Sequence, residues 1–363
     1  PYMACIIAHE NMNVYAYVSI VEVALKLGIV FLLRVLPYDK LIVYGVLLAF
    51  VALVNTSIYR FYCRKHYAEC RFVFVKDRAL FKEIISYSGW NLFGAAVGVV
   101  KNQIINILLN INFGAVVNAA RGIASQVNSA VVSFSQNFST ALRPQIIKNY
   151  AAGQKSETMN LVFRGCKFTF YLMYLFALPL CLEMKIILNL WLKNPPEYAL
   201  TFTQLALIDA VVDSISYPLM TLAQATGKIK LYQGVVGGIL LCNLPVAYIV
   251  LKLGAPAYAV MVVAICITFL AFVVRLAIIK HLAGFLITDF ILRAVLPCAA
   301  VALFSALLPV VFSVYFAESF VRLCLTTFIS LCSTALCVLF IGMNRIERIA
   351  VVASVKSKLR GAK

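Results

Sequence analysis

The stretch PAYAVMVVAICITFLAFVV (256–274) contains no charged side chain and decides the class of fold. A helix that crosses the hydrocarbon core of a bilayer needs about 20 consecutive, predominantly apolar residues. Similar apolar runs recur along almost the whole chain of 363 residues, in which 63% of residues are hydrophobic and only 13% are charged. Soluble domains are about half apolar and about a quarter charged. The sequence therefore predicts an integral membrane protein whose solvent is lipid.

Ten apolar stretches are predicted to form transmembrane helices, with proline or glycine at many of the joints between them. They predict an all-α fold, a polytopic membrane helix bundle without a large soluble domain. The predicted spans are residues 13–35, 40–60, 86–110, 116–142, 160–184, 199–224, 230–252, 256–280, 289–312 and 317–342.

The 32 Lys and Arg residues are distributed unevenly over the connectors between these spans. When the connectors are assigned alternately to two sides of the membrane, twenty-three basic residues fall on one side and six on the other, and three lie inside spans. Cytoplasmic loops carry such an excess of Lys and Arg, so the C-terminal tail is predicted to be cytoplasmic. Basic loops that face an anionic leaflet also account for the formal net charge of +18 without a nucleic-acid partner.

The same assignment places Lys167 and Arg275, at the edges of two predicted spans, with the basic residues of the cytoplasmic connectors. Residues 61–85 form the only sizeable connector. This segment is basic and partly amphipathic, and it is predicted to be the cytoplasmic joint between two helical lobes.

The sequence contains no recognisable motif for metal binding or covalent catalysis. Its eleven Cys residues are scattered without a C-x-x-C pair, so we expect them to be small packing residues. Its three His residues lie near loops, and there is no phosphate-binding glycine loop, nucleophile elbow or kinase signature. No metal, no cofactor and no enzymatic activity are therefore expected.

Ionisable residues at membrane depth usually face a cavity or a partner, because burying a charge in lipid is costly. In the span 13–35, Tyr15, Ser19, Glu22 and Lys26 share one helix face. Glu22 and Lys26 have the i,i+4 spacing of a helical ion pair. This pair is either a neutralised structural pair, or Lys26 faces a central cavity and binds an anionic head group while Glu22 tunes its charge.

The span 86–110 is rich in amides and carries Lys101 about halfway along its length. Asn102, Asn106 and Asn110 repeat every four residues and form one stripe, and Asn91 lies nearer the start. Such amides serve equally well as contacts between helices or with substrate. Lys101 is more informative, because no acid lies one helical turn away.

The span 116–142 is too polar to face lipid on all sides. A polar face runs along its whole length, which favours a lined cavity over a buried network between helices. Arg121 suits a phosphate group through its planar guanidinium, and the other residues suit a sugar chain. The residues of this face are Asn118, Arg121, Ser125, Asn128, Ser135 and Ser139, with Gln126, Gln136 and Asn137 beside them.

Asp209 and Asp213 form an i,i+4 pair of acids in the span 199–224. They are candidates for counter-ions to Lys101 or Arg121, or for acids that bind a proton or a coupling cation.

At the level of whole segments, the sequence resembles a known family. The stretch FGAVVNAARGIASQVNSAVVSFSQNFSTALRPQIIKNYAAGQ (113–154) resembles the eighth-helix region of Wzx-type polysaccharide flippases. These proteins belong to the multidrug, oligosaccharidyl-lipid and polysaccharide exporter (MOP) superfamily. Residues 1–30, 191–233 and 243–260 are similar to the same family.

The resemblance implies a MATE-like architecture of two six-helix lobes followed by two further helices. In that register the chain would begin at the end of helix four, with part of the N-lobe missing before Pro1. The implied parts are the remainder of the N-lobe (1–62), the linker between lobes (63–85), the C-lobe (86–282), and two additional helices with a basic tail (283–363).

The resemblance also implies a function. Such flippases move oligosaccharides linked to undecaprenyl pyrophosphate across the bacterial inner membrane for O-antigen, capsule or exopolysaccharide synthesis, alongside a polysaccharide polymerase. Cationic residues of a central cavity would hold the pyrophosphate, which implies that role for Lys26, Lys101 and Arg121. The alternatives are a cation-coupled multidrug exporter of the same fold and a membrane glycan polymerase or ligase.

Overall fold

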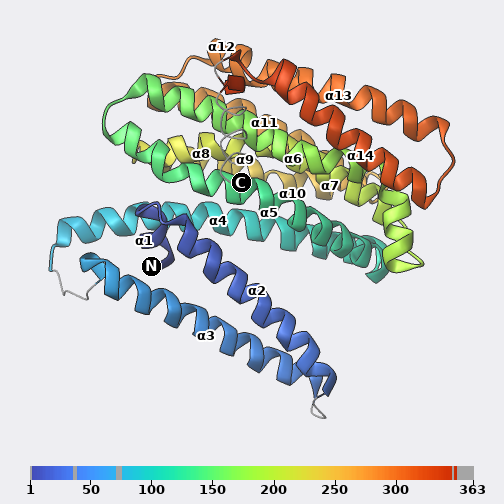
Figure 1. The fold of residues 1–363 in the computed structure, drawn as a ribbon, viewed down its shortest axis with the longest axis horizontal. Coiled ribbons are helices and arrows are strands. Elements are labelled where there is room, and N and C mark those ends of the chain that lie inside the picture. The colour runs from blue at the N-terminus through green and yellow to red at the C-terminus, as the bar shows by residue number, and fades with distance from the viewer. Residues whose placement is uncertain (1, 36–38, 71–75, 346, 350–363) are drawn as a thin grey trace, which may run out of the picture. The chain divides into compact units, whose positions relative to one another are not determined.

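The computed structural model describes residues 2–35, 39–70, 76–345 and 347–349, and within these residues it contains helices and no strands (Figure 1). The predicted all-α membrane helix bundle is confirmed at this level. The helices are α1 (Tyr2–Ala8), α2 (Met12–Val35), α3 (Lys40–His66), α4 (Arg78–Phe113), α5 (Ala115–Ala151), α6 (Lys155–Leu192), α7 (Ala199–Ser214), α8 (Ser216–Ala225), α9 (Ile229–Leu241), α10 (Asn243–Lys252), α11 (Ala259–Ala283), α12 (Ile287–Phe290), α13 (Leu296–Tyr315) and α14 (Phe320–Cys337). Three short elements complete them, the 3₁₀ turn η1 (Ala68–Cys70) and the π-helical turns η2 (Ile291–Val295) and η3 (Val338–Gly342).

The number of membrane spans is smaller than the predicted ten when length and composition are applied strictly. Within the described residues, eight helical segments are long and apolar enough to cross a membrane, and α7 with α8 makes a ninth if the bent pair is one span. The predicted span 116–142 is part of the long helix α5, which does not qualify. The reason is its polar face, which lowers the mean hydropathy although the helix has 37 residues.

Prolines explain where two of the predicted spans break. Helix α7 ends at Ser214 and α8 continues at an angle of 40°. Pro218 lacks the N–H that would bond the carbonyl of Ser214, and its ring crowds that carbonyl. Pro245 stands in the same relation to Leu241, the last residue of α9. Pro144, Pro179 and Pro309 lie inside unbroken helices, so the surrounding packing also decides where a helix breaks.

The contacts divide the chain into two units, Pro1–Phe81 and Lys82–Lys363. The predicted linker 61–85 is largely helical, because α3 continues to His66 and α4 begins at Arg78, where Asp77 caps the first turn through its carboxylate. The described non-helical part of this connector is therefore shorter than predicted, and residues 71–75 lie outside the described part. The role of the segment as a cytoplasmic joint between two lobes stays a prediction. The predicted division into lobe remainder, C-lobe and extra helices stays a prediction.

The larger unit holds most of the packed core. Helix α5 contacts α6, α7 and α8, and α13 and α14 run side by side along α6 (Figure 1). One buried cluster gathers around Phe163, Phe285 and Phe290, and a second around Met173 and Phe202. Helix α5 packs on these neighbours through one face, with Ala120, Ala124 and Ser135 buried, whereas Gln126 and Asn137 on its polar side are exposed.

The smaller unit consists of α1, α2, α3 and η1, which contact one another. Its core is a small cluster of Ile6, Cys63 and Tyr67. Helices α2 and α3 expose most of their apolar side chains, as expected for helices that face lipid.

Candidate substrate cavity

Four helices of the larger unit enclose a small polar cavity of about 80 Å³. Such a volume holds a few water molecules, at about 10–15 Å³ for each, but no sugar ring. Small side chains on three of these helices, Ala124, Ala206 and Ala264, leave the space open. The polar residues that line it are Lys101 and Asn102 of α4, Arg121, Ser125 and Asn128 of α5, and Asp209 of α7, and Met261 of α11 is apolar.

The guanidinium of Arg121 is positioned by neutral groups. Its Nε donates to Oδ1 of Asn106 at 2.8 Å and its Nη2 donates to Oδ1 of Asn102 at 3.3 Å. Its Nη1 lies 3.0 Å from the sulfur of Met261, which is a weak acceptor. The two asparagines are one turn apart on α4, so the amide stripe seen in the sequence presents its oxygens to one cation on α5.

Asp209 lies within electrostatic range of both Lys101 and Arg121. Within the described residues, no carboxylate comes within ion-pair distance of either cation. Oδ1 of Asp209 is buried and has no hydrogen-bond partner in the described part of the chain, and the same holds for Oδ1 of Asn128. Buried polar atoms without a partner are uncommon and point to a ligand or to ordered water. The cavity therefore carries two cations, one acid and two unsatisfied oxygens.

Three other residues predicted for the cavity lie elsewhere. Asn91 donates to the carbonyl of Tyr87 and accepts from Gln224 at 3.4 Å, near the opposite end of α4 from Phe113. Asn118 is half-buried and Gln126 is exposed, and neither lines the cavity. Spacing in the sequence selects one face of a helix, and such a face is longer and wider than this cavity.

Lys26 belongs to the smaller unit, where its Nζ lies 2.6 Å from a carboxylate oxygen of Glu22. The side chains are 51% and 35% exposed, so the pair is a partly solvated i,i+4 pair. A role for Lys26 or Glu22 in binding substrate stays a prediction.

The two acids of α7 have different surroundings, because Asp209 lines the cavity and Asp213 pairs with an arginine. Oδ1 of Asp213 lies 3.6 Å from Nη1 of Arg275, whose guanidinium also lies 5.9 Å from the ring of Tyr232. Arg275 is buried inside α11, so its assignment to a basic connector is wrong. The sequence does indicate a buried position for Arg275, because the predicted span 256–280 contains this residue and a cation inside a span needs a partner.

Lys167 was also assigned to a connector, and this too is wrong. It is 2% exposed within α6, and its Nζ donates to Glu347 at 2.7 Å and to the carbonyl of Gly342 at 3.2 Å. Arg164, one turn earlier, approaches the same carboxylate at 3.3 Å. These contacts join α6 to the end of the last helical segment, whereas residues 350–363 of the predicted basic tail lie outside the described part.

Comparison with known families bears on this part of the chain. Residues 92–249 match the MatE family model. MatE proteins are membrane transporters of the MOP superfamily and not enzymes, which favours transport over the polymerase or ligase alternative. The MatE segment contains every polar residue that lines the cavity. No curated protein and no solved structure matches the chain.

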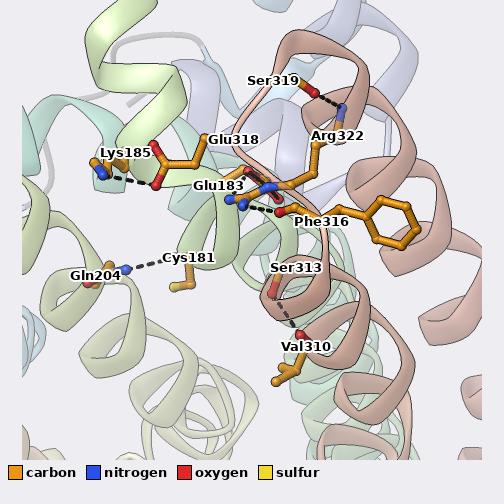
Figure 2. Close-up of polar contacts among 10 residues, drawn as sticks. All are labelled: Cys181, Glu183, Lys185, Gln204, Val310, Ser313, Phe316, Glu318, Ser319 and Arg322. Atoms are coloured by element: carbon orange, nitrogen blue, oxygen red, sulfur yellow. Dashed lines mark hydrogen bonds and ion pairs between the residues drawn. The ribbon is translucent and has the colours of Figure 1, made fainter.

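An ion pair between Arg322 and the buried Glu183 was not predicted from the sequence. Figure 2 shows Glu183 of α6 facing Arg322 in the first turn of α14. Nη2 of Arg322 donates to Oε2 of Glu183 at 3.0 Å and Nε donates to Oε1 at 3.1 Å, while Nη1 donates to the carbonyl of Phe316. Glu183 is 0% exposed. These residues are 139 positions apart, and no local pattern connects them.

Within the described residues, the one group with several metal-ligand donors is Cys5, His9 and Glu69, whose donor atoms lie within 4.8 Å of one another. His9 contacts the carboxylate of Glu69 directly and stacks on Tyr67 at 4.0 Å. A hydrogen bond from its own backbone amide, together with the contact to His9, lowers the pKa of the Glu69 carboxyl. His9 and Glu69 thus satisfy each other, so the cluster needs no ion to account for it.

Proposed function

We propose that this protein is a flippase of the bacterial inner membrane that moves oligosaccharides linked to undecaprenyl pyrophosphate. The observation that carries the proposal is the convergence of Lys101 and Arg121 on one cavity that contains a single acid, Asp209. With Asp209 ionised, the lining side chains have a net charge of about +1, which favours an anionic ligand over a cationic drug.

The geometry of Arg121 suits the exchange of a neutral partner for a phosphate. Its Nη1 faces the thioether of Met261, a weak acceptor that a phosphate oxygen would replace with gain. The amides of Asn102 and Asn106 would meanwhile keep the guanidinium in position. Lys101 would add a point charge to the same anion.

The rest of the substrate needs more room than the structure offers here. A cavity of about 80 Å³ admits a few water molecules, so a glycan requires the helices around it to separate. In transporters built from two lobes, the substrate site lies near the midplane and opens by rocking of one lobe against the other. The lipid tail would stay in the bilayer, and no covalent step is needed.

The test is a flipping assay with the purified protein in liposomes that contain a fluorescent lipid-linked oligosaccharide in the inner leaflet. We expect the protein to bring the label to the outer leaflet and Arg121→Ala to abolish this movement. Arg121→Lys should retain a part of it, because the charge remains while the planar fork is lost. An Arg121→Ala protein that folds and flips at the wild-type rate would contradict the proposal.

A cation-coupled exporter of the same fold is the second candidate, and one observation favours it. The unpartnered oxygens of Asp209 and Asn128 lie in a space that suits a proton or a small hydrated cation. Asp209→Asn separates the candidates, because a cation-coupled exporter of cationic drugs would lose transport. A carrier of anions would keep its affinity for pyrophosphate or gain some, since the variant removes the one acid among the described residues that line the cavity.

A further inference from the structure

A second, larger cavity lies away from the substrate cavity, at the end of the unit where α9 begins and α11 ends. It has a volume of about 620 Å³, within the range of about 300–1,000 Å³ that is common for ligand sites. Trp90 of α4 forms one wall, and Leu231 and Val235 of α9 together with Leu282 form much of the remainder. The walls are therefore mainly apolar.

The mouth of this cavity is cationic. Lys228 and Lys230 line it beside His281, and within the described residues no carboxylate lines the cavity or lies within ion-pair distance of either lysine. Nζ of Lys230 lies 5.7 Å above the ring of Trp90. Among the described residues, no carboxylate neutralises the positive charge of this site.

An apolar groove continues from this cavity along α4. It has a volume of about 460 Å³ and is lined by Ile85, Gly89 and Phe93, and it shares Trp90 and Gly234 with the first cavity. Gly234 leaves the face of the indole open on this side, where a β-carbon would make van der Waals contact at 3.8 Å. Together the two spaces form a cationic pocket and an adjoining apolar groove.

The depths of these features suit the parts of a lipid. The lysines lie at the first residues of α9, where a membrane helix meets the head groups. The groove extends along α4 from Ile85, near that level, to Phe93, which lies beside Gly237 further along α9. Tryptophan is enriched at this interface because its ring is apolar and its N–H is polar. Basic pockets between membrane helices bind acidic head groups.

The geometry points to a binding site for an anionic glycerophospholipid, with its phosphodiester at Lys228 and Lys230 and an acyl chain along Trp90 and the groove. A zwitterionic phospholipid brings its own cation to the mouth and gains less there. The head group expected here is a monoanionic phosphodiester, because lysines act as point charges and the site contains no arginine fork. This site is independent of the transport proposed above.

Brominated lipids test the site directly, because bromine on an acyl chain quenches a nearby indole. The chain has only two tryptophans, so Trp191→Phe leaves Trp90 as the single reporter. In nanodiscs, dibrominated phosphatidylglycerol should quench Trp90 at a lower mole fraction than dibrominated phosphatidylcholine does. Each lysine near an acidic head group contributes about fivefold to such a preference. Lys228→Gln with Lys230→Gln should therefore abolish it, whereas replacement of both by Arg should retain it.

The chain offers a matched control at the opposite end of the same predicted span. Nζ of Lys252 also lies 5.7 Å from an aromatic ring, that of Tyr248, but it lines neither cavity. Lys252→Gln should leave the preference unchanged. Equal quenching by the two lipids would overturn the inference, as would a Lys252→Gln effect as large as that of the double variant. Displacement of the brominated lipid by a tenth of its amount of undecaprenyl phosphate would assign the site to the carrier lipid instead.

Discussion

Two arginines inside the larger unit, Arg322 and Arg121, are held in opposite ways. Arg322 forms two charged hydrogen bonds with Glu183, which is 0% exposed, and its third contact is a backbone carbonyl (Figure 2). Arg121 is held by two neutral amides and a thioether, in a cavity whose one acid has an oxygen without a partner. The first arginine has its full complement of strong partners, and the second does not.

The difference separates a structural charge from a charge that is available to a ligand. If a ligand took one member of a buried, fully hydrogen-bonded ion pair, the other member would stay buried without a partner. Such a pair therefore holds two helices together. A cation whose contacts are neutral can exchange one of them for an anion at little cost. An arginine at membrane depth can therefore be structural or can bind a ligand, and its hydrogen-bond partners distinguish the two roles.

The largest expected effect is that of Arg322→Ala on stability. The change leaves the carboxylate of Glu183 buried without its partner, which costs about 3–5 kcal/mol. We expect a lower midpoint of thermal unfolding in detergent and a protein that unfolds at a lower fraction of added SDS.

The double variant Glu183→Met with Arg322→Met is the matched control for this experiment. Replacing both members of a buried pair by apolar residues is often neutral or stabilising. It should therefore recover most of the lost stability. If Arg322→Ala unfolds at the wild-type midpoint, the two arginines do not differ as described.

Arg121→Ala should have the next largest effect, on binding instead of stability. Hydrogen bonds to charged groups are worth about 1.5–3 kcal/mol, so affinity for a soluble prenyl pyrophosphate should fall by about 10- to 150-fold. The free energy of unfolding should change by less than about 1 kcal/mol, because the partners left behind are neutral. Isothermal titration calorimetry and thermal unfolding on the same sample measure both quantities. A large loss of stability with unchanged affinity would place Arg121 in the same class as Arg322.

Lys101→Gln should weaken binding less than Arg121→Ala does. Lys101 lines the cavity as a point charge, and its removal should cost about 1 kcal/mol, or roughly fivefold in affinity. The loss should shrink as salt is added, because a partly solvated charge is screened. An effect larger than that of Arg121→Ala would reverse the assigned roles of the two cations.

The smallest effect is expected from Lys185→Gln. Nζ of Lys185 lies 2.9 Å from Glu318, near the buried pair, but the two side chains are 59% and 46% exposed (Figure 2). Exposed pairs contribute about 0–1 kcal/mol, so the midpoint of unfolding should move by no more than a degree or two. A shift comparable to that of Arg322→Ala would mean that burial does not decide the strength of these pairs.

The polar residues of α4 and α5 show how far local patterns lead. The spacing of Asn102 and Asn106 predicts one stripe, and the polar face of α5 predicts that this helix avoids lipid. Both inferences depend on residues within a few turns of one another. Which amide reaches Arg121, and that Asn118 and Gln126 lie outside the cavity, depends on how two helices are rotated against each other. Spacing along one helix carries no information about that rotation.

Charges near the ends of spans were the least predictable from sequence. The positions of Lys167 and Arg275 predict a place in a connector, since each lies within a few residues of a predicted span boundary. Packing decides otherwise, because Glu347 and Asp213 come from distant helices and accept these cations inside the bundle.

The sequence by itself determines that this chain forms apolar helices and which helix is too polar for lipid. These properties follow from hydrophobicity and from backbone hydrogen bonds within one segment. Only the tertiary structure decides that Asp213 pairs with Arg275 while Asp209, one turn away, faces the cavity. It also decides that Glu183 meets a residue 139 positions later. The physical reason is that a salt bridge between helices depends on the rotation, depth and neighbours of those helices. By chemistry alone, many other acids and bases of this chain could have formed the same kind of pair.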